Sequence, residues 1–166
     1  MGTTSEAVPP SRRLLFTAEL IVPVVILALD QASKAWVRGT LTLNQPVSVI
    51  GDLVRLTYIH NRGAAFGLSV GSHSSLVFLV LATLASALVL YLFMTAGREE
   101  RLQRVALAMI LGGALGNIID RIRWSMVVDF IQVGVAGRYW PIFNVADSAV
   151  TIGAVLLGYA YLKQGR

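Results

Sequence analysis

The sequence predicts an all-α membrane protein with four transmembrane helices and a small extracytoplasmic β-sheet. The first observation behind this prediction is composition, since 55% of the 166 residues are hydrophobic and only 14% are charged. The mean hydropathy of +0.69 is far too high for a soluble domain of this length. The second observation is a set of four long apolar stretches, and the third is a strand-like segment between the first two stretches.

The apolar stretches predict membrane spans at approximately 14–37, 75–96, 105–124 and 142–162. A span needs about 20 residues at 1.5 Å rise per residue, and its backbone polar groups must bond to one another, so each span should be helical. No clear small-x-small cleavage site follows the first stretch, so we expect this span to be retained. The chain then divides into a disordered cytoplasmic N-terminus, 1–13, and a single four-helix integral membrane domain, 14–166.

The basic residues predict that both termini are cytoplasmic. The 14 Lys and Arg residues divide evenly between the two faces of a four-span layout. The segment "GREERLQR", 97–104, breaks this tie because it places three arginines in a short loop between two spans. Several basic residues on the opposite face stand beside carboxylates, which indicates a site there.

The connections on the outer face predict β structure. Between the first two spans, "LVRLTYIHN", 53–61, partly alternates apolar and polar residues. Between the last two spans, a β-prone run at 127–133 precedes two glycines and a proline. Trp124, Tyr139 and Trp140 in this second connection suit the aromatic belt at a membrane interface.

Composition also argues against several kinds of chemistry. The chain has no cysteine, which excludes disulfides, thiol nucleophiles and thiolate metal sites. His60 and His73 are too few for a histidine-rich metal centre. The net charge of +5 comes from scattered basic residues without a nucleic-acid-binding motif. We therefore expect no metal, no cofactor and no nucleic-acid partner.

The main functional signal is a group of carboxylates near the outer ends of the spans. Five of the nine acidic residues lie in the outer half of the layout: Asp30, Asp52, Asp120, Asp129 and Asp147. An aspartate at mid-bilayer costs about 2.5 to 3.5 kcal/mol, so such residues usually face a polar interior and serve a function. Asp30 and Lys34, four residues apart, form either a local ion pair or a pair in which Lys34 contacts a substrate or a lipid head group.

The segment "GGALGNIIDR", 112–121, predicts a closely packed helix with a polar outer end. Its GxxxG spacing favours close helix contact. Gly113, Asn117 and Asp120 share one helical face. The adjacent Arg121 offers Asp120 a partner, so we interpret Asp120 as structural.

Asp129 and Asp147 are the carboxyls best suited to chemistry. Asp129 stands in "MVVDFI" among apolar neighbours, which should raise its pKa, whereas an exposed loop aspartate would keep an ordinary pKa. Asp147 follows Asn144 by three residues at the start of the last span, where the two could form a capping box. Serine, threonine or asparagine could cap a helix without a carboxyl, so capping alone does not account for Asp147.

The connection between Asp129 and Asp147 is long enough to bring their carboxyls together. Two carboxyls at hydrogen-bond distance share one proton, so that one can take a proton from water while the other polarises a scissile carbonyl. The residues alone leave open an aspartic protease, a small ion- or proton-coupled transporter and a non-catalytic scaffold. The carboxylates cluster towards one face and no inverted repeat is visible, which argues against a transporter.

Five motifs, in order, resemble the family of lipoprotein signal peptidase, the bacterial signal peptidase II. The motifs are "DQASK" (30–34), "NRGAAFG" (61–67), "GGALGNIIDR" (112–121), "VVDF" (127–130) and "FNVADS" (143–148). The match covers roughly residues 14–162, and the order, the spacing and the four-span layout agree. Five motifs in one order make this resemblance specific.

The resemblance implies a multi-pass aspartyl endopeptidase of the bacterial cytoplasmic membrane, with its site near the outer leaflet. Members of this family remove signal peptides from prolipoproteins by cutting before a cysteine that carries a diacylglyceryl group. A small β-sheet cradle, here supplied by residues 40–70, would embrace the substrate. The implied partners are prolipoproteins with diacylglyceryl-cysteine, membrane lipids and cyclic peptide inhibitors.

The resemblance also implies the site residues. The matching catalytic pair is Asp129 and Asp147, although Asp120 has been a candidate within the family. Positions that line or support the site match Asn61, Gly63, Arg121, Asn144 and Ala146, and positions that hold the helices match Asp30, Lys34, Gly113, Asn117 and Asp120. Small residues at 63–65, including Ala64, would let a peptide approach closely. Candidate donors to a tetrahedral intermediate are Arg121 and the amides of Asn61 and Asn144. Glu19 has no assigned role and leaves the start of the first span open.

Overall fold

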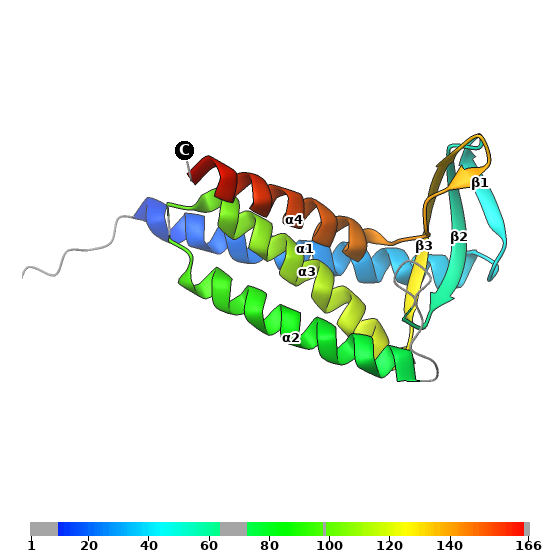
Figure 1. Cartoon of the computed structure of the whole chain (residues 1–166), viewed down its shortest axis with the longest axis horizontal. Helices are drawn as coiled ribbons and strands as arrows, with labels where there is room; N and C mark the ends of the chain where they lie inside the picture. Colours follow the sequence, from blue (N-terminus) through cyan, green and yellow to red (C-terminus); the bar gives the residue numbers. More distant parts are fainter. Residues whose placement is uncertain (1–9, 64–72, 98, 165–166) are drawn as a thin grey trace, which may run out of the picture.

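The computed structural model describes residues 10–63, 73–97 and 99–164. Its four long helices are α1 (Pro10–Thr40), α2 (Ser74–Thr95), α3 (Arg101–Trp124) and α4 (Val145–Gln164), arranged as an elongated bundle (Figure 1). Each helix contains a segment long and apolar enough to cross a membrane. Together with the small antiparallel sheet described below, these helices confirm the predicted fold class.

The helix bounds differ from the predicted spans by a few residues at most ends. Helix α1 begins at Pro10, inside the segment predicted to be disordered, and residues 1–9 lie outside the described ranges. Helix α3 begins at Arg101 rather than at 105, and α4 begins at Val145 rather than at 142. Apolarity marks only the lipid-facing part of a helix, whereas hydrogen bonding continues into polar turns at the interface.

The sheet lies beyond one end of the helix bundle (Figure 1). Its strands are β1 (Pro46–Ile50), β2 (Val54–Asn61), β3 (Val127–Val135) and β4 (Arg138–Tyr139), antiparallel in the order β1-β2-β3-β4. Strands β1 and β2 follow α1, and strands β3 and β4 follow α3, so the sheet joins two connections that are far apart in sequence. The strand predictions at 53–61 and 127–133 are therefore confirmed.

An apolar cluster fixes the sheet to the end of α1. Val37 of α1, Tyr58 of β2, and Val128 and Phe130 of β3 are buried against one another. Because side chains alternate along a strand, Val128 and Phe130 face this cluster while Asp129 between them faces the opposite side. Burial of the apolar face therefore sets the direction of the Asp129 side chain.

Helix α3 packs against each of the other three helices. A Cβ atom at Gly112 would lie 2.8 Å from the Pro23 Cα of α1, and one at Gly116 would lie 2.4 Å from the Asp30 carboxylate. The predicted GxxxG face therefore does make a close helix contact, and that contact is with α1.

Glu19, for which the sequence offered no role, belongs to a buried polar cluster at the end of the bundle away from the sheet. Its carboxylate pairs with the Arg104 guanidinium of α3. The same guanidinium donates to the Phe93 and Ala96 carbonyl oxygens at the end of α2, at 3.2 and 3.1 Å. This cluster ties α1, α2 and α3 together.

Candidate active site

The sheet presents Asp129 to the helix bundle. In the β2–β3 pairing Asp129 lies opposite Ile59, and Asn61 is two residues further along β2 on the same face. Asn61 Nδ2 donates to Asp129 Oδ2 at 2.9 Å, and Asn144 Nδ2 donates to Asp129 Oδ1 at 2.7 Å. Only 2% of Asp129 is exposed. The carboxyl is thus buried, with both oxygens accepting hydrogen bonds from neutral amides.

This environment raises the pKa of Asp129 to about 7. The main cause is burial, which disfavours the charged form, and the nearby charge of Asp147 acts in the same direction. The hydrogen bonds from Asn61 and Asn144 and the charge of Lys34 oppose the rise without cancelling it. The predicted raised pKa is therefore confirmed, and Asp129 holds a proton until near-neutral pH.

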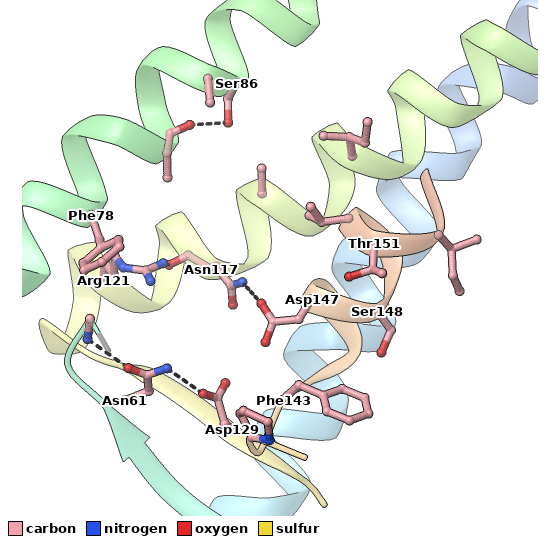
Figure 2. Close-up of a pocket in the computed structure, with 18 of the residues that line it drawn as sticks. Asn61, Phe78, Ser86, Asn117, Arg121, Asp129, Phe143, Asp147, Ser148 and Thr151 are labelled. Atoms are coloured by element: carbon pink, nitrogen blue, oxygen red, sulfur yellow. Dashed lines mark hydrogen bonds between the residues drawn. The ribbon is translucent and has the colours of Figure 1, made fainter. Parts of the chain in front are cut away.

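Asp147 stands in the first turn of α4 and makes the capping box that its spacing predicted. The Asn144 backbone N–H donates to Asp147 Oδ2 at 3.2 Å, and the Asp147 backbone N–H donates to Asn144 Oδ1 at 2.8 Å. Asn117 Nδ2 of α3 donates to Asp147 Oδ1 at 2.8 Å (Figure 2). The same carboxyl therefore caps its helix and faces the pocket described below.

The chain between the two aspartates returns along β3 before α4 begins. Phe143 forms a bridge with Ile131, in which the Phe143 N–H donates to the Ile131 carbonyl at 3.0 Å and the reverse bond is 2.8 Å. This bridge places Asn144 beside Asp129, and α4 begins at the next residue. Asn144 consequently contacts Asp129 through its side-chain amide nitrogen and Asp147 through the two capping hydrogen bonds.

Asp129 and Asp147 line the same pocket, whose volume is about 870 Å³. Figure 2 shows the two carboxyls pointing into it from β3 and from the start of α4. Helices α2, α3 and α4 and the segment before α4 form most of the wall, and residues of β3 and of the end of β2 complete it. The apolar lining residues are Gly63, Phe78, Ala82, Ala85, Val89, Ile110, Leu111, Ala114, Trp140, Pro141, Ile142, Phe143, Val150 and Ile152, and the polar ones are Asn61, Ser86, Asn117, Arg121, Asp129, Asp147, Ser148 and Thr151. The pocket thus combines an acidic pair with an extended apolar wall.

Arg121 supplies positive charge to this pocket. Its guanidinium lies 6.0 Å from the centre of the Phe78 ring, and its Nη1–H donates to the Asn117 backbone carbonyl oxygen at 3.2 Å (Figure 2). Its Nε–H is buried and has no hydrogen-bond partner within the described part of the chain. Arg121 lines the pocket and its guanidinium carries five N–H donors, so it can supply a donor to an oxygen of a bound molecule.

The expected ion pair between Asp120 and Arg121 does not describe the Asp120 environment. The basic partner of Asp120 is Lys34 of α1, at 3.0 Å, and Lys34 also pairs with Asp30 at 2.9 Å. All three side chains are fully buried. The Asp30–Lys34 local pair is therefore confirmed, while a Lys34 contact with a lipid head group is incompatible with its burial. Residues adjacent in a helix point about 100° apart, so Arg121 faces the pocket and Asp120 faces α1.

Two positions of the predicted site require glycine because other atoms lie too close for a side chain. Gly63 has a φ of +112°, and a Cβ there would lie 2.6 Å from a Phe78 ring carbon. The Gly63 N–H donates to Asn61 Oδ1 at 2.9 Å, which leaves Asn61 Nδ2 directed at Asp129. A Cβ at Gly113 would lie 2.4 Å from the Ala146 carbonyl oxygen, so α3 and α4 pack backbone to backbone just before Asp147. Ala64 lies outside the described residues.

A Gly113→Ala variant should therefore displace the start of α4. Overpacking of this kind costs about 1–3 kcal/mol, and we expect any reaction that depends on Asp147 to slow because Asp147 moves with the helix. Gly158→Ala is the matched control on α4, since a Cβ there meets nothing within 4 Å. Thermal unfolding and turnover of both variants test this expectation, and equal behaviour of the two would contradict it.

Sequence reasoning missed several residues that complete the site. Gln31 donates to Asp30, to Asp120 and to the Gly116 carbonyl, at 3.2, 3.1 and 3.3 Å. It stood inside the first motif, and its position between two charged residues of a span was a usable signal. Phe78 and Ser86 bring α2 into the pocket, and Ser86, one of few polar residues in that apolar stretch, was a weak signal.

A family model described as signal peptidase (SPase) II matches residues 22–163. A lipoprotein signal peptidase from Desulforapulum autotrophicum is 45% identical, with the alignment covering 84% of this chain and 88% of the relative. One from Moorella thermoacetica is 40% identical over 89% of this chain and 97% of the relative. A bacterial membrane enzyme solved by the in meso method at 2.3 Å resolution superposes with a TM-score of 0.81 at 32% identity, covering 90% of each chain. With four membrane-crossing helices and a matching family model over most of its length, the chain belongs to the signal peptidase II family of bacterial membrane proteases.

Proposed function

We propose that this protein is an aspartic endopeptidase that removes signal peptides from diacylglyceryl-modified prolipoproteins, cutting before the lipid-modified cysteine. The observation that carries the proposal is the meeting of Asp129 and Asp147 in one pocket of a membrane helix bundle. The relatives named lipoprotein signal peptidase support this substrate class. The family assignment gives no support to the transporter or scaffold alternatives.

In the proposed mechanism the two carboxyls have different roles. Asp129 holds a proton, because its pKa is about 7, and donates it to the oxygen of the scissile carbonyl. Asp147, as a carboxylate, takes a proton from the attacking water. When the intermediate collapses and the C–N bond breaks, Asp147 gives its proton to the leaving amine and Asp129 takes back the proton from the hydroxyl that becomes the new carbonyl. The amides of Asn61 and Asn144 already donate to Asp129, so we assign stabilisation of the intermediate to the guanidinium of Arg121, which lines the same pocket.

The shape of the pocket supports a lipid-modified peptide as substrate. The wall formed by α2, α3 and α4 is mostly apolar, with small side chains at Ala82, Ala85 and Ala114. Such a wall suits acyl chains or an apolar peptide segment that arrives from the bilayer.

We further propose that both termini are cytoplasmic and that the site lies near the outer leaflet. The start of α1, the α2–α3 connection and the end of α4 lie together at the end of the bundle away from the sheet (Figure 1). The arginine-rich segment 97–104, which favours the cytoplasm, covers most of that connection and the first turn of α3.

A cleavage assay in detergent tests the proposed function directly. The purified protein should convert a diacylglyceryl-modified precursor into a free signal peptide and a shortened lipoprotein. The same precursor without its lipid is the control for the lipid requirement. An intact lipid-modified precursor after incubation with folded protein would refute the proposal, as a transporter or a scaffold would leave it uncut.

The rate of cleavage should fall as the pH rises above about 7. The pKa of Asp129 is raised to about 7, so its proton is present below that pH and is lost above it. Because the proposed mechanism needs that proton, single-turnover rates should decline on the alkaline side, with an apparent midpoint that belongs to the coupled pair. Rates that keep rising to pH 9 would contradict this assignment of the proton.

A further inference from the structure

A fully buried cluster of three charged side chains lies behind the acidic pair, on the side of α1. The Lys34 ammonium has three N–H donors, and its three close acceptors are Asp30 Oδ2 at 2.9 Å, Asp120 Oδ2 at 3.0 Å and Asn117 Oδ1 at 3.0 Å. Asp30, Lys34 and Asp120 are each 0% exposed. None of the three lines the pocket, so none is placed to touch a substrate there.

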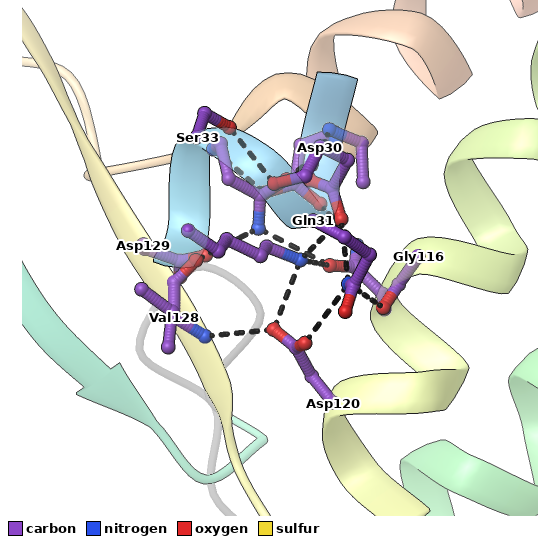
Figure 3. A network of polar contacts seen from close by, with 12 residues as sticks. Asp30, Gln31, Ser33, Gly116, Asp120, Val128 and Asp129 are labelled. Carbon is purple, nitrogen blue, oxygen red and sulfur yellow. Dashed lines mark hydrogen bonds and ion pairs between the residues drawn. The ribbon is translucent and has the colours of Figure 1, made fainter. Parts of the chain in front are cut away.

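Each carboxylate of this cluster also accepts a backbone N–H from a distant part of the chain. Asp30 Oδ1 accepts the Ala146 N–H at 3.0 Å. Asp120 Oδ2 accepts the Val128 N–H at 3.2 Å (Figure 3). Ala146 directly precedes Asp147, and Val128 directly precedes Asp129. The two carboxylates on either side of Lys34 therefore hold the backbone immediately before each member of the acidic pair.

We propose that the Asp30–Lys34–Asp120 cluster is a positioning group that sets the separation of the Asp129 and Asp147 carboxyls. This inference rests on the proposed function, because it takes those two carboxyls to be the catalytic pair. Lys34 holds Asp30 and Asp120 at a fixed distance from each other. Asp30 in turn fixes the start of α4 through Ala146, and Asp120 fixes β3 through Val128.

Two neutral side-chain amides, those of Asn117 and Gln31, add further hydrogen bonds to this cluster. Lys34 donates to Asn117 Oδ1, so the Asn117 amine is directed at Asp147 Oδ1 at 2.8 Å. Gln31 donates to both Asp30 and Asp120 and so bridges them a second time. A buried ion cluster is an expensive way to hold helices together, since desolvation offsets much of its attraction. Packing the helices together would not require hydrogen bonds to the Ala146 and Val128 N–H groups, so these contacts indicate that the cluster also positions the acidic pair.

The test compares Asp120→Ala with Asp120→Asn in the full-length protein. Alanine removes the acceptor for the Val128 N–H, whereas asparagine is isosteric and keeps an oxygen that can accept it. A displacement of about 1 Å in a catalytic group costs about 100-fold in rate. We expect Asp120→Ala to lower kcat by about that factor with KM changed little, and we expect Asp120→Asn to be at least about tenfold faster than Asp120→Ala.

Glu19→Ala is the matched control, because it also removes one carboxylate from a buried ion pair between α1 and α3, at the far end of the bundle. It should lower thermal stability and leave the kcat of the folded protein near that of the parent. Full activity in Asp120→Ala would overturn the inference, and so would asparagine being no faster than alanine or Glu19→Ala losing kcat as severely.

Two further outcomes keep the inference separate from the proposed function. If Asp120→Ala does not accumulate as folded protein, the inference is tested by Asp120→Asn alone. This variant should keep more than about 1% of the parental kcat, and a lower value overturns the inference. If the parent protein itself cleaves no lipid-modified precursor, the proposed function fails. If the parent cleaves and the Asp120 variants match it, only the positioning role fails.

Discussion

Asp129→Asn and Asp147→Asn should each lower the rate of cleavage by about four orders of magnitude or more, while each variant still inserts and accumulates. An asparagine cannot take a proton from water at neutral pH, and it cannot donate a proton to the carbonyl as a carboxylic acid does. When groups act as a unit, loss of one costs nearly as much as loss of all. Either substitution should therefore be sufficient to abolish measurable turnover.

The hydrogen bonds at these positions predict that both variants remain folded. An asparagine at 147 still offers an oxygen to the Asn144 N–H, which Asp147 Oδ2 accepts at 3.2 Å, so the cap of α4 can persist. Loss of activity with an intact fold would separate the chemical role of Asp147 from its capping role.

Asp129→Asn should even stabilise the folded protein at neutral pH. The folded-state pKa of Asp129 is about 7 against an ordinary 3.8, so between these values the unfolded chain loses a proton that the folded chain keeps. Folding stability therefore falls as the pH rises from about 4 to 7, by up to about 4 kcal/mol at about 1.4 kcal/mol per pKa unit. Asparagine avoids this cost. The gain in stability should be smaller than this cost, because the side-chain NH₂ group of the new asparagine would face one of the two donors, Asn61 or Asn144.

The measurement is cleavage of a diacylglyceryl-modified precursor, with thermal unfolding recorded on the same preparations across pH 5 to 8. Asp52→Asn is the control, since the Asp52 side chain is 78% exposed in the β1–β2 connection and pairs with Arg55 three residues away. It should leave both quantities unchanged. Full activity in either pocket variant would remove that residue from the proposed pair.

The four spans and the two strand segments could be predicted because they depend on local properties. Apolar runs of about 20 residues mark spans, and period-two patterns mark strands, whatever the rest of the chain does. The Asn144–Asp147 cap is also local, and its three-residue spacing predicted its contacts. The bounds were less accurate because polar turns extend α1 and α3 beyond the apolar runs.

Partners far apart in sequence could not be predicted from one chain. Arg121 adjoins Asp120, yet Asp120 pairs with Lys34, because the direction of each side chain around α3 decides its partner. The meeting of Asp129 and Asp147 was predicted as a possibility that the long connection allows. Its actual geometry depends on the Phe143–Ile131 bridge and on Asn144, which no periodicity reveals.

The partner of Glu19 likewise could not be predicted from the sequence. Substitution of that partner should have the largest effect on stability. An acidic residue inside an apolar stretch had no visible partner within one helix turn. The structure pairs it with Arg104, 85 positions later in the sequence. Neither residue contacts the pocket, so this pair tests stability apart from chemistry.

Arg104→Met should destabilise the folded protein by about 3–5 kcal/mol, because removing one partner leaves the Glu19 carboxylate buried and uncompensated. The Phe93 and Ala96 carbonyls at the end of α2 would also lose a donor. Resistance to unfolding in detergent is the measurement, and Arg101→Met, an exposed residue one turn earlier on α3, is the control. The kcat of protein that remains folded should stay near that of the parent.

A Glu19→Leu/Arg104→Met double variant then separates the charge from the packing. Replacing both partners of a buried ion pair by apolar residues is often close to neutral, so the double variant should be more stable than Arg104→Met alone. Recovery should remain incomplete, because the two α2 carbonyls still lack the donor that Arg104 supplied. A double variant less stable than the single one would mean that the Glu19 carboxylate has other essential contacts, and that the buried charge is not the source of the loss.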